Sequence, residues 1–584
     1  MTTITLDGES LTIEQLVRIA RDSNVRVECD PATNERVTRS EELIRKIVEN
    51  YRSAWEAGTA APSEYGVTTD FGEFKDKPIA PADLEQLQRN LLLSHSAGVG
   101  SNADPDDMAN YFATEVVRGA LATRLNAFLK GYSGVRRKLV EIVEAMLNRR
   151  VVPLVPLRGS VGASGDLCPL SHLFVVLLGV GRFYVSGGQA PGLSGQAGAP
   201  VLHNASELPS FLGFTAEEMK PTFKEGLALV NGANFSAAML ALAVHDAEKL
   251  ANTADGAAAL TLESVCGCTR ALDENVHQER GHAGQIESAR RIRALLMGSR
   301  LVERAGAVQD AYSLRCAPQV HGATRDTIAF VRTTAQREIN AATDNPLFFP
   351  DNAEPFDMNF RANWPEWYHG DRRLAYSAGN FHGQPLALAA DFLTIAISEL
   401  ANISERRTQL MLDGHHNRGL PQNLTTRPGV NSGLMIAQYT AASIVSENKV
   451  LAHPASVDSI PTSANAEDHV SMSTYATRKL RTVMSNVEAV LAIELMTSAQ
   501  AVEWRVTMNL DPNQPAPKLL GHDEAEQQAK EFESRVGGKA RQIAEHLGQG
   551  TRALYLRVRE IAQPVFRDRP LDEDIRKLRA VVSG

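Results

Sequence analysis

The sequence predicts a mainly α-helical protein, in which a bundle of long helices forms the core and a small mixed α/β region precedes it. Two observations predict this class. From about residue 225 onward, apolar residues recur at the spacing of helices over long stretches. Before that point, short helical and extended patterns alternate between many glycines and prolines. With 584 residues, 43% of them hydrophobic and 22% charged, the chain is long enough for more than one core or for one elongated helical core.

The N-terminal region, residues 1–224, is expected to hold short elements of both kinds. Residues 4–6 and 26–28 have the composition of short strands, and residues 13–21 between them have the pattern of a helix. Residues 187–205 are rich in glycine, alanine, proline and serine, which predicts an irregular loop.

Residues 225–507 are expected to form the central helical bundle. The segments 384–411, 433–452 and 480–491 carry apolar residues at helical spacing on more than one side. A helix that is apolar on several sides belongs in the middle of a bundle or at a subunit interface. We therefore interpret these apolar positions as core.

The last region, residues 508–584, is expected to be a peripheral helical cap. Its start is marked by a break at Pro512, Pro515 and Pro517. The charged, amphipathic segments 522–548 and 570–582 that follow have the pattern of surface helices.

Composition excludes several classes of function. The net charge of −9, without a clustered basic face, argues against a nucleic-acid-binding protein. Five cysteines in 584 residues indicate a reducing compartment, and the lone pair Cys266 and Cys268 is a weak metal signal, so no metal is expected. The first residues lack the pattern of a signal peptide, and no uncharged apolar run is long enough for a membrane span. We expect a cytoplasmic protein that binds neither membranes nor nucleic acids.

Residues 159–169, Gly-Ser-Val-Gly-Ala-Ser-Gly-Asp-Leu-Cys-Pro, carry the strongest chemical signal. At their centre, Ala163, Ser164 and Gly165 combine one hydroxyl with the smallest side chains, and glycine lets the backbone fold back closely on itself. The Gly165 nitrogen can then reach the Ala163 carbonyl, and cyclisation with loss of water makes an exocyclic methylene of Ser164. The product is an electrophile that no ordinary side chain supplies. A short run of this kind is otherwise typical of a flexible loop.

The longer run, which continues through Pro-Leu-Ser-His at 169–172, resembles the signature of the aromatic amino acid ammonia-lyase and aminomutase family. Members of that family form a 4-methylidene-imidazol-5-one (MIO) group from such an Ala-Ser-Gly. The resemblance extends through separate motifs from about residue 10 to about residue 505. It implies the fumarase/aspartase-like helical fold, an aromatic amino acid as substrate, and a homotetramer whose active sites draw on three subunits. It implies neither a metal nor a nucleotide.

The segment Glu-Tyr-Gly-Val-Thr-Thr-Asp-Phe-Gly at 64–72 resembles the inner lid loop of the family, which makes Tyr65 the candidate catalytic base. A phenol has an ordinary pKa of about 10, so it becomes a strong base once its surroundings lower that pKa. We expect helix N-termini that point at the site to help ionise it. The sequence departs from the family at Asp70, which is expected to stiffen the loop or to add negative charge near the mouth.

Further motifs match the family one by one. In the Gln309–Cys316 run, the resemblance implies that Tyr312 contacts the electrophile or the substrate's amine and that Arg315 binds the substrate carboxylate. The forked guanidinium of arginine suits a carboxylate. The remaining substrate-contacting positions implied by the resemblance are Asn231, Gln285, Asn345, Phe381 and Gln384. Histidine-specific members tend to have glutamate at the position of Gln384, so this position argues against a histidine-specific enzyme.

Two places bear on which ring the pocket holds. Ser94-His95 is typical of histidine ammonia-lyases and also occurs in tyrosine aminomutases, whereas Glu467 resembles the histidine-directed form, in which a glutamate faces the imidazole. A carboxylate suits the N–H of imidazole and would be desolvated and unpaired against a phenyl ring. As an alternative, Glu467, Asp468 and His469 could form an acidic first turn of a helix.

We therefore expect elimination of ammonia from L-histidine to give trans-urocanate. The alternative within the family is a 2,3-aminomutase, or an ammonia-lyase, acting on tyrosine or histidine, because the lid segments also resemble tyrosine 2,3-aminomutases. A non-catalytic helical scaffold is the alternative outside it. Residues 351–378, which are rich in aromatic side chains, are expected to be a surface excursion or an extra wall near the active-site mouth.

Overall fold

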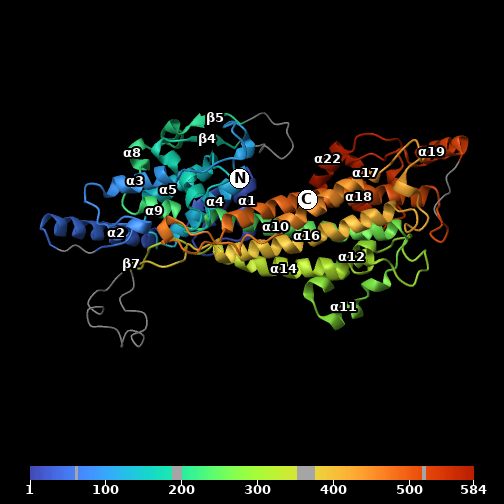
Figure 1. Cartoon of the computed structure of the whole chain (residues 1–584), viewed down its shortest axis with the longest axis horizontal. Coiled ribbons are helices and arrows are strands. Elements are labelled where there is room, and N and C mark those ends of the chain that lie inside the picture. The colour runs from blue at the N-terminus through green and yellow to red at the C-terminus, as the bar shows by residue number, and fades with distance from the viewer. Residues whose placement is uncertain (60–62, 187–199, 351–374, 516–520, 584) are drawn as a thin grey trace. The chain divides into compact units, whose positions relative to one another are not determined.

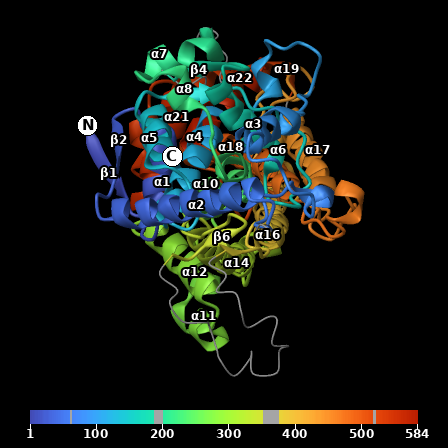
Figure 2. The same ribbon diagram turned by 90° about the vertical axis from the view of Figure 1, so that its left-hand side faces the viewer.

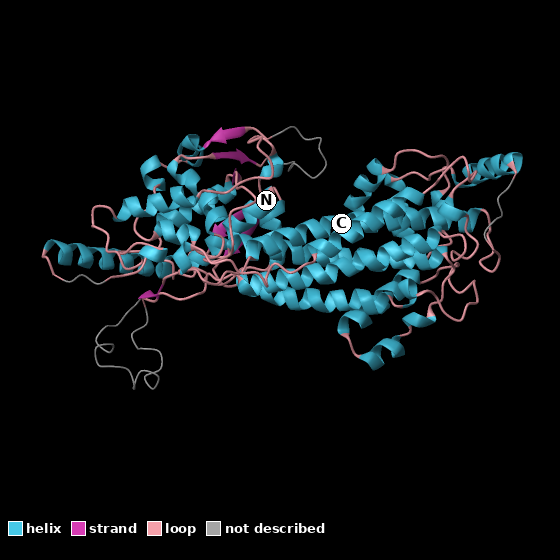
Figure 3. Ribbon diagram, in the orientation of Figure 1, coloured by secondary structure: helices cyan, strands magenta, loops and turns pink. Residues whose placement is uncertain are grey.

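The computed structural model describes residues 1–59, 63–186, 200–350, 375–515 and 521–583, and helices predominate in them, as predicted (Figures 1 and 3). These residues divide into two compact units. Unit 1 comprises Met1–Leu242, Arg332–Ala390 and Pro454–Arg478. Unit 2 comprises Ala243–Val331, Asp391–His453 and Lys479–Gly584. The three consecutive regions expected from composition stay a prediction.

The first strands and helix of unit 1 confirm the prediction for the N-terminal residues. Strands β1 (Thr2–Leu6) and β2 (Val25–Cys29) pair in parallel, with α1 (Ile13–Arg21) connecting them. A capping box starts α1, because the Thr12 hydroxyl accepts from the Gln15 amide and the Gln15 side chain accepts from the Thr12 amide. The buried face of α1 packs on α4 (Thr114–Leu129), close to which it lies in Figure 2. Nearly all residues of α4 are buried.

A three-stranded antiparallel sheet follows in unit 1, with the order β3 (Val151–Pro153), β4 (Arg182–Val185) and β5 (Leu202–Asn204). The expectation of an irregular loop over 187–205 is therefore wrong at its end, since residues 202–204 pair with β4. The stacking of His203 on Phe183, at 5.3 Å between ring centroids, adds to this pairing. Residues 187–199 lie outside the described residues.

The remaining helices of unit 1 are short apart from α2. They are α2 (Thr33–Glu56), α3 (Leu84–His95), α5 (Arg137–Asn148), α6 (Leu167–Phe174), α7 (Leu208–Leu212), α8 (Ala216–Met219) and α9 (Glu225–Val230). Strands β6 (Leu347–Phe348) and β7 (Ala375–Tyr376) form a further antiparallel pair. The aromatic-rich segment predicted at 351–378 falls outside the described residues except for its last four, which include β7.

Four long helices contribute residues to both units. They are α10 (Asn234–Ser264), α14 (Ala317–Glu338), α16 (Gln384–Leu412) and α18 (Ser473–Thr507). Together with α17 (Met435–Leu451), they confirm the long helices predicted at 384–411, 433–452 and 480–491. By length and composition α16 could cross a membrane, but 67% of its most apolar window is buried inside the protein, as in the core helix of a bundle.

Within unit 2, the long helices are joined by buried charges as well as by apolar packing. The Arg407 guanidinium of α16 donates to both oxygens of Glu494 on α18, at 2.5 and 2.8 Å, and the Thr261 hydroxyl of α10 donates to the same carboxylate at 2.8 Å. The other helices of this unit are α11 (Glu274–Arg280), α12 (Ala283–Leu296), α13 (Tyr312–Arg315), α19 (His522–Val536), α20 (Ala540–Ala544), α21 (Gln549–Ile561) and α22 (Asp572–Ser583).

The C-terminal helices differ from the prediction in one respect. The helix expected over 522–548 is interrupted after Val536, because two glycines follow and Gly538 has a positive φ of 68°. The helix expected over 570–582 is confirmed as α22. The Phe532 ring of α19 stacks on the buried Trp504 of α18 at 3.9 Å between ring centroids, which fixes α19 on the bundle of unit 2.

Candidate functional site

The predicted tripeptide lies in the loop between β3 and α6, and its glycines are required by close packing. Gly162 and Gly165 have positive φ values of 71° and 76°. A Cβ on Gly162 would lie 2.4 Å from the Ser471 hydroxyl, and one on Gly165 would lie 2.2 Å from the carbonyl carbon of Gly232. Any side chain at either position would therefore displace neighbouring atoms. The loop is held in a tight cradle and is not a free connection.

Gly232, which follows α9, runs beside the tripeptide as an isolated parallel bridge to Gly165. Its amide donates to the Ser164 carbonyl at 3.2 Å, and its carbonyl accepts from the Asp166 amide at 2.8 Å. The predicted residue Asn231 is the preceding position, is buried, and has an Oδ1 without a hydrogen-bond partner among the described residues. The two segments therefore hold the tripeptide from one side.

Asp166, directly after the tripeptide, anchors it to the first turns of α10 and α18 and was not among the predicted site residues. Its buried carboxylate accepts from the Ser236 amide at 2.8 Å, the Ser236 hydroxyl at 2.7 Å and the Thr474 hydroxyl at 2.6 Å. Burial raises the pKa of this carboxyl, and these hydrogen bonds oppose the rise. Its place directly after the tripeptide was the only sequence signal for this role.

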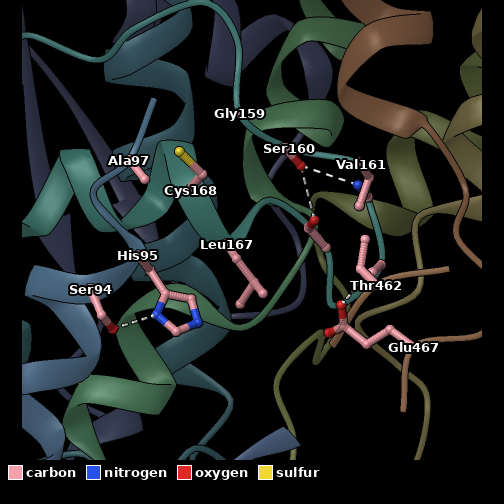
Figure 4. Close-up of a pocket in the computed structure, with 13 residues that line it drawn as sticks. Ser94, His95, Ala97, Gly159, Ser160, Val161, Leu167, Cys168, Thr462 and Glu467 are labelled. Atoms are coloured by element: carbon pink, nitrogen blue, oxygen red, sulfur yellow. Dashed lines mark hydrogen bonds between the residues drawn. The ribbon is translucent and has the colours of Figure 1, made fainter. Parts of the chain in front are cut away.

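A pocket of about 360 Å³ opens in front of this loop within unit 1. Its lining residues are Ser94, His95, Ala97, Gly159, Ser160, Val161, Gly162, Ala163, Gly165, Leu167, Cys168, Thr462 and Glu467. Figure 4 shows His95 and Glu467 on facing walls, with the tripeptide loop along one side. Five of the predicted site residues, Ser94, His95, Ala163, Gly165 and Glu467, thus line one cavity.

Glu467 is the acidic group of this pocket. Its Oε1 accepts from the Ser164 hydroxyl at 2.7 Å, and its Oε2 accepts from the Thr462 hydroxyl at 2.7 Å. Thr462 and Glu467 also form an isolated backbone bridge. The alternative of an acidic first helical turn does not hold, because α18 begins only at Ser473.

His95 is the last residue of α3, and its Nδ1 lies 3.0 Å from the Ser94 hydroxyl. Burial lowers the pKa of His95, while the charge of Glu467 raises it. The pocket therefore places a neutral imidazole, able to donate or accept, across from a carboxylate.

Tyr65 lies outside the pocket lining, on the segment that leads into Gly72, whose amide donates to the Tyr65 hydroxyl at 3.4 Å. Burial raises the pKa of Tyr65, and the charges of Glu467 and Asp70 raise it further. The described residues of the single chain therefore do not lower this pKa, and the lowering expected in the assembled site stays a prediction. The Asp70 carboxylate accepts from the Phe71 amide at 2.8 Å, and its charge acts on Tyr65, while its effect on the loop stays a prediction.

Three further predicted residues of unit 1 also lie outside the pocket lining. The Asn345 side chain donates to Ser377 at 3.2 Å and accepts from the Ala378 amide at 2.7 Å. The Gln384 amide donates to the Ser456 carbonyl at 3.2 Å, while its oxygen has no partner among the described residues. Phe381, which shortly precedes Gln384 in the sequence, is half-buried. Their contact with substrate stays a prediction.

The remaining predicted residues belong to unit 2. Gln285 is buried and its amide is engaged by His277 and Arg280, at 2.9 and 3.2 Å. Tyr312 is 72% exposed, and the Arg315 guanidinium lies over its ring at 4.6 Å from the centroid. Gln309, the first residue of the same motif, accepts from Arg315 and was missed as a site residue. Membership in this motif was the sequence signal that pointed to Gln309.

A buried anchor precedes this exposed turn. The Asp310 carboxylate accepts from the Cys268 amide at 2.7 Å and from the Arg418 guanidinium at 2.6 Å. Cys266 and Cys268 are free thiols, and no group of three histidine, cysteine or acidic side chains suited to a metal occurs in the described ranges. The turn that carries Tyr312 and Arg315 is therefore fixed at its base and open at its tip.

Comparison with known proteins identifies a set of relatives. The sequence profile named aromatic amino acid lyase matches residues 11–526. A histidine ammonia-lyase from Caldanaerobacter subterraneus subsp. tengcongensis is 43% identical over 579 residues, which cover 98% of this chain and 95% of that protein.

Solved structures agree with this likeness. The crystal structure of a histidine ammonia-lyase from Trypanosoma cruzi is similar with a TM-score of 0.77 and 34% identity, covering 100% of this chain and 93% of the other. The tyrosine aminomutase from Streptomyces globisporus is similar with a TM-score of 0.80 and 31% identity, covering 100% of this chain and 97% of the other. The fold class expected from the resemblance is thereby confirmed.

Proposed function

Because the chain belongs to the aromatic amino acid lyase family, and is thus a carbon–nitrogen lyase, we propose that it eliminates ammonia from L-histidine and releases trans-urocanate. The observation that carries the choice of substrate is the carboxylate of Glu467, which lines the pocket and accepts a hydrogen bond from the Ser164 hydroxyl. The curated relative at 43% identity, named histidine ammonia-lyase, supports the same choice.

The polar lining of the pocket favours an imidazole over a phenyl ring. Imidazole offers an N–H donor to Glu467 and a second nitrogen to the opposite wall, where His95 lies. A phenyl ring would desolvate the Glu467 carboxylate and return no hydrogen bond, at a cost of roughly 2 kcal/mol or more. The substrate's ring is thus recognised by charge and hydrogen bonding.

We infer that Ala163, Ser164 and Gly165 mature into the MIO group, because the residues present fit it. The cradle around Gly162 and Gly165 leaves no room for larger side chains and presses the chain against Gly232. When present, the group supplies an electrophile that takes up the substrate's amino group and makes it a better leaving group. Loss of the Ser164 hydroxyl would also free Glu467 Oε1, which that hydroxyl occupies in this structure, for the substrate's ring N–H.

The proposed roles of the other residues follow from their chemistry. Arg315 would bind the substrate carboxylate through its fork, and Tyr312 would contact the amine. Tyr65 would take the proton from the β-carbon, for which the assembled enzyme has to supply the positive potential that the single chain lacks. Side chains proposed to orient the substrate are Ser94, His95, Asn231, Gln285, Asn345, Phe381 and Gln384.

We further propose a homotetramer with shared active sites. The pocket is lined by unit 1 alone, whereas Tyr312 and Arg315 stand on an exposed turn of unit 2. In addition, Leu388, Phe392 and Ile395 are exposed on α16 at the spacing of one helix face, and α17 exposes further apolar side chains. A second copy of this chain would cover that face and could bring its own Tyr312 to the pocket.

The free cysteines, of which three are buried, fit a reducing compartment, and we place the enzyme in the cytoplasm on that ground. No metal or nucleotide enters the proposal.

The proposed reaction is tested by incubating the purified enzyme with L-histidine and, separately, with L-tyrosine. Urocanate is followed by its ultraviolet absorbance, and mass spectrometry of the products reports any β-amino acid. Turnover of histidine to urocanate is the expected result. Turnover of tyrosine without turnover of histidine would overturn the proposal.

The second candidate is a 2,3-aminomutase, supported by the similarity to the tyrosine aminomutase from Streptomyces globisporus. A mutase keeps the acrylate and the ammonia bound and returns the amine to the β-carbon, so the two reactions differ in how long the site stays closed. The same product analysis separates them, because only the mutase yields a β-amino acid.

A further inference from the structure

Two buried cations share one carboxylate behind the tripeptide. The Lys224 ammonium donates to Asp344 Oδ2 at 2.8 Å, and both side chains are almost completely buried. Arg124 of α4 has no exposed surface, and only its Nη1 is satisfied among the described residues, by Asn234 Oδ1 at 2.9 Å. Its Nε and Nη2 have no hydrogen-bond partner there. An Arg head group buried with so few partners is expensive, which points to a function.

The Arg124 guanidinium lies directly against Gly232. A Cβ on Gly232 would lie 2.6 Å from Arg124 Nη1 and 2.8 Å from the Thr343 hydroxyl. Gly232 in turn donates its amide to the Ser164 carbonyl and forms the bridge to Gly165. A single backbone residue therefore separates the buried guanidinium from the reactive tripeptide.

The charges around the tripeptide are distributed unevenly. The Glu467 carboxylate contacts the tripeptide through the Ser164 hydroxyl, and the carboxylate of Asp166, the next residue after the tripeptide, accepts from the Ser236 hydroxyl of α10. Arg124 and Lys224 lie behind Gly232, where Asp344 offsets one positive charge. Although burial lowers the pKa of Arg124 to about 10, the group stays protonated near neutral pH. The Ser164 carbonyl, which faces Gly232, thus lies on the positive side.

We propose that Arg124 is a positioning residue that polarises the Ser164 carbonyl through Gly232, and so promotes maturation of the tripeptide and the reactivity of its product. The inference rests on the proposed function. In maturation, Gly165 N bonds to the Ala163 carbonyl carbon, whose oxygen leaves as water with the nitrogen-bound protons. Ser164 then loses its Cα proton and its hydroxyl as a second water, and a carbon–carbon double bond forms. No oxidant is required.

The polarised carbonyl bears on the second of these steps. The proton that leaves Ser164 is on the carbon next to that carbonyl, and positive charge near the oxygen makes such a proton more acidic. The same field draws electrons from the methylene that forms, which makes it a better acceptor for an amine or any other nucleophile. Arg124 would thereby promote both the formation of the methylene and its reactivity, without touching the substrate.

The test compares Arg124→Met, Arg124→Lys and Asn234→Asp with the full-length wild type. Asn234→Asp keeps the shape of the site and adds a carboxylate that cancels the guanidinium charge, at a helix N-terminus where an acid is tolerated. The matched control is Arg118→Met, because Arg118 is equally buried on α4, also has its pKa lowered to about 10, and bonds the carbonyls of Ile19 and Leu147 instead.

Two readouts that do not depend on turnover are used: the intact mass, which reports loss of water, and the rate of hydride uptake from borohydride. We expect Arg124→Met and Asn234→Asp to be incompletely cyclised and their cyclised fraction to react about tenfold more slowly. Arg124→Lys should keep most of the cyclisation and most of the reaction rate with borohydride. Arg118→Met should lose only thermal stability.

Each outcome decides between the proposals. If Arg124→Met does not fold, Asn234→Asp gives the answer alone. Suppose that the wild type is cyclised and that Asn234→Asp has the same loss of water and the same rate of hydride uptake. This result would overturn the role of Arg124 and leave the proposed function intact. A wild type that shows no loss of water would overturn the proposed function, and this inference with it.

Discussion

The Ser164 hydroxyl donates a 2.7 Å hydrogen bond to Glu467, a residue 303 positions away in the sequence. In the proposed function, this contact joins the proposed precursor of the electrophile to the side chain proposed to recognise the ring. If the tripeptide matures as proposed, the Glu467 oxygen that now binds the Ser164 hydroxyl would become available to a ring N–H.

Glu467→Gln is expected to lower kcat/KM for histidine about 100-fold, because the amide replaces a charged acceptor that the imidazole N–H requires. Maturation should proceed normally, as judged by intact mass. The matched control is Asp468→Asn, which removes the neighbouring exposed carboxylate. An unchanged kcat/KM in Glu467→Gln would refute the assignment of ring recognition to this residue.

Ser164→Ala is expected to abolish turnover while leaving the fold intact, because alanine has no hydroxyl to lose and cannot form the methylene. The intact mass should correspond to the full, uncyclised chain, and borohydride should add nothing. Ser160→Ala is the control in the same loop, since the Ser160 hydroxyl donates to Gly165 O at 3.3 Å without belonging to the tripeptide. Wild-type activity in Ser164→Ala would remove the electrophile from the mechanism.

Mixed oligomers test whether the sites are shared between subunits. Tyr65→Phe and Arg315→Met, each alone, are expected to be nearly inactive. When the two variants are co-expressed, about a quarter of the sites should combine an intact Tyr65 from one copy with an intact Arg315 from another, and that fraction of activity should return. Activity that stays at the level of the separate variants would show that each site is built from one chain.

Asp310→Asn is expected to raise the KM for histidine about tenfold with a smaller change in kcat, because the 2.6 Å ion pair with Arg418 fixes the base of the turn that carries Arg315. Maturation is measured by intact mass and should be complete. Glu526→Gln serves as the control, since it breaks the more exposed ion pair with Arg427 at 2.7 Å. Equal effects of the two substitutions would argue against a positioning role.

Glu263→Gln is expected to increase stability above pH 7. Burial raises the pKa of Glu263 to about 7, and its Oε2 has no partner among the described residues. The folded state therefore holds a proton that the unfolded state has already released, so stability is lost as pH rises from about 4.5 to about 7, by about 1.4 kcal/mol per pH unit. Glutamine keeps the acceptor for the Gly548 amide, which Glu263 engages at 2.7 Å.

The measurement for Glu263→Gln is thermal unfolding between pH 5 and 8.5. The control, Glu287→Gln, removes a carboxyl whose pKa is lowered by its hydrogen bond with Arg290, and it should gain nothing at high pH. Parallel pH profiles for wild type and Glu263→Gln would contradict the prediction.

Much of the architecture was predictable because it depends on local pattern. The strand, helix and strand at the N-terminus and the long helices over 384–411 and 480–491 were all visible as short alternations or helical spacing. The exceptions are also physical. The pairing of β5 with β4 depends on a distant partner strand, and the break between α19 and α20 depends on two glycines inside an otherwise helical pattern.

The residues of the candidate site were predictable where they belong to a sequence motif. They were less predictable where their role depends on tertiary contacts. Ser94, His95, Ala163 and Glu467 were named from sequence and line one pocket. Asp166 and Gln309 stood inside quoted motifs and were missed, because a motif does not say which of its members point at a neighbour. The raised pKa of Tyr65 in the single chain was also missed, since it comes first from burial of the phenol and then from the charges of Glu467 and Asp70 in the folded chain.

The sequence by itself determined the candidate tripeptide and the helical class, because small residues in series and a periodic apolar pattern are properties of neighbouring positions. Only the tertiary structure decided what surrounds that tripeptide. Gly232 meets Gly165, and Arg124 meets Gly232, through packing between segments that are tens of residues apart. Such contacts depend on how whole elements pack, and no spacing along the chain encodes them.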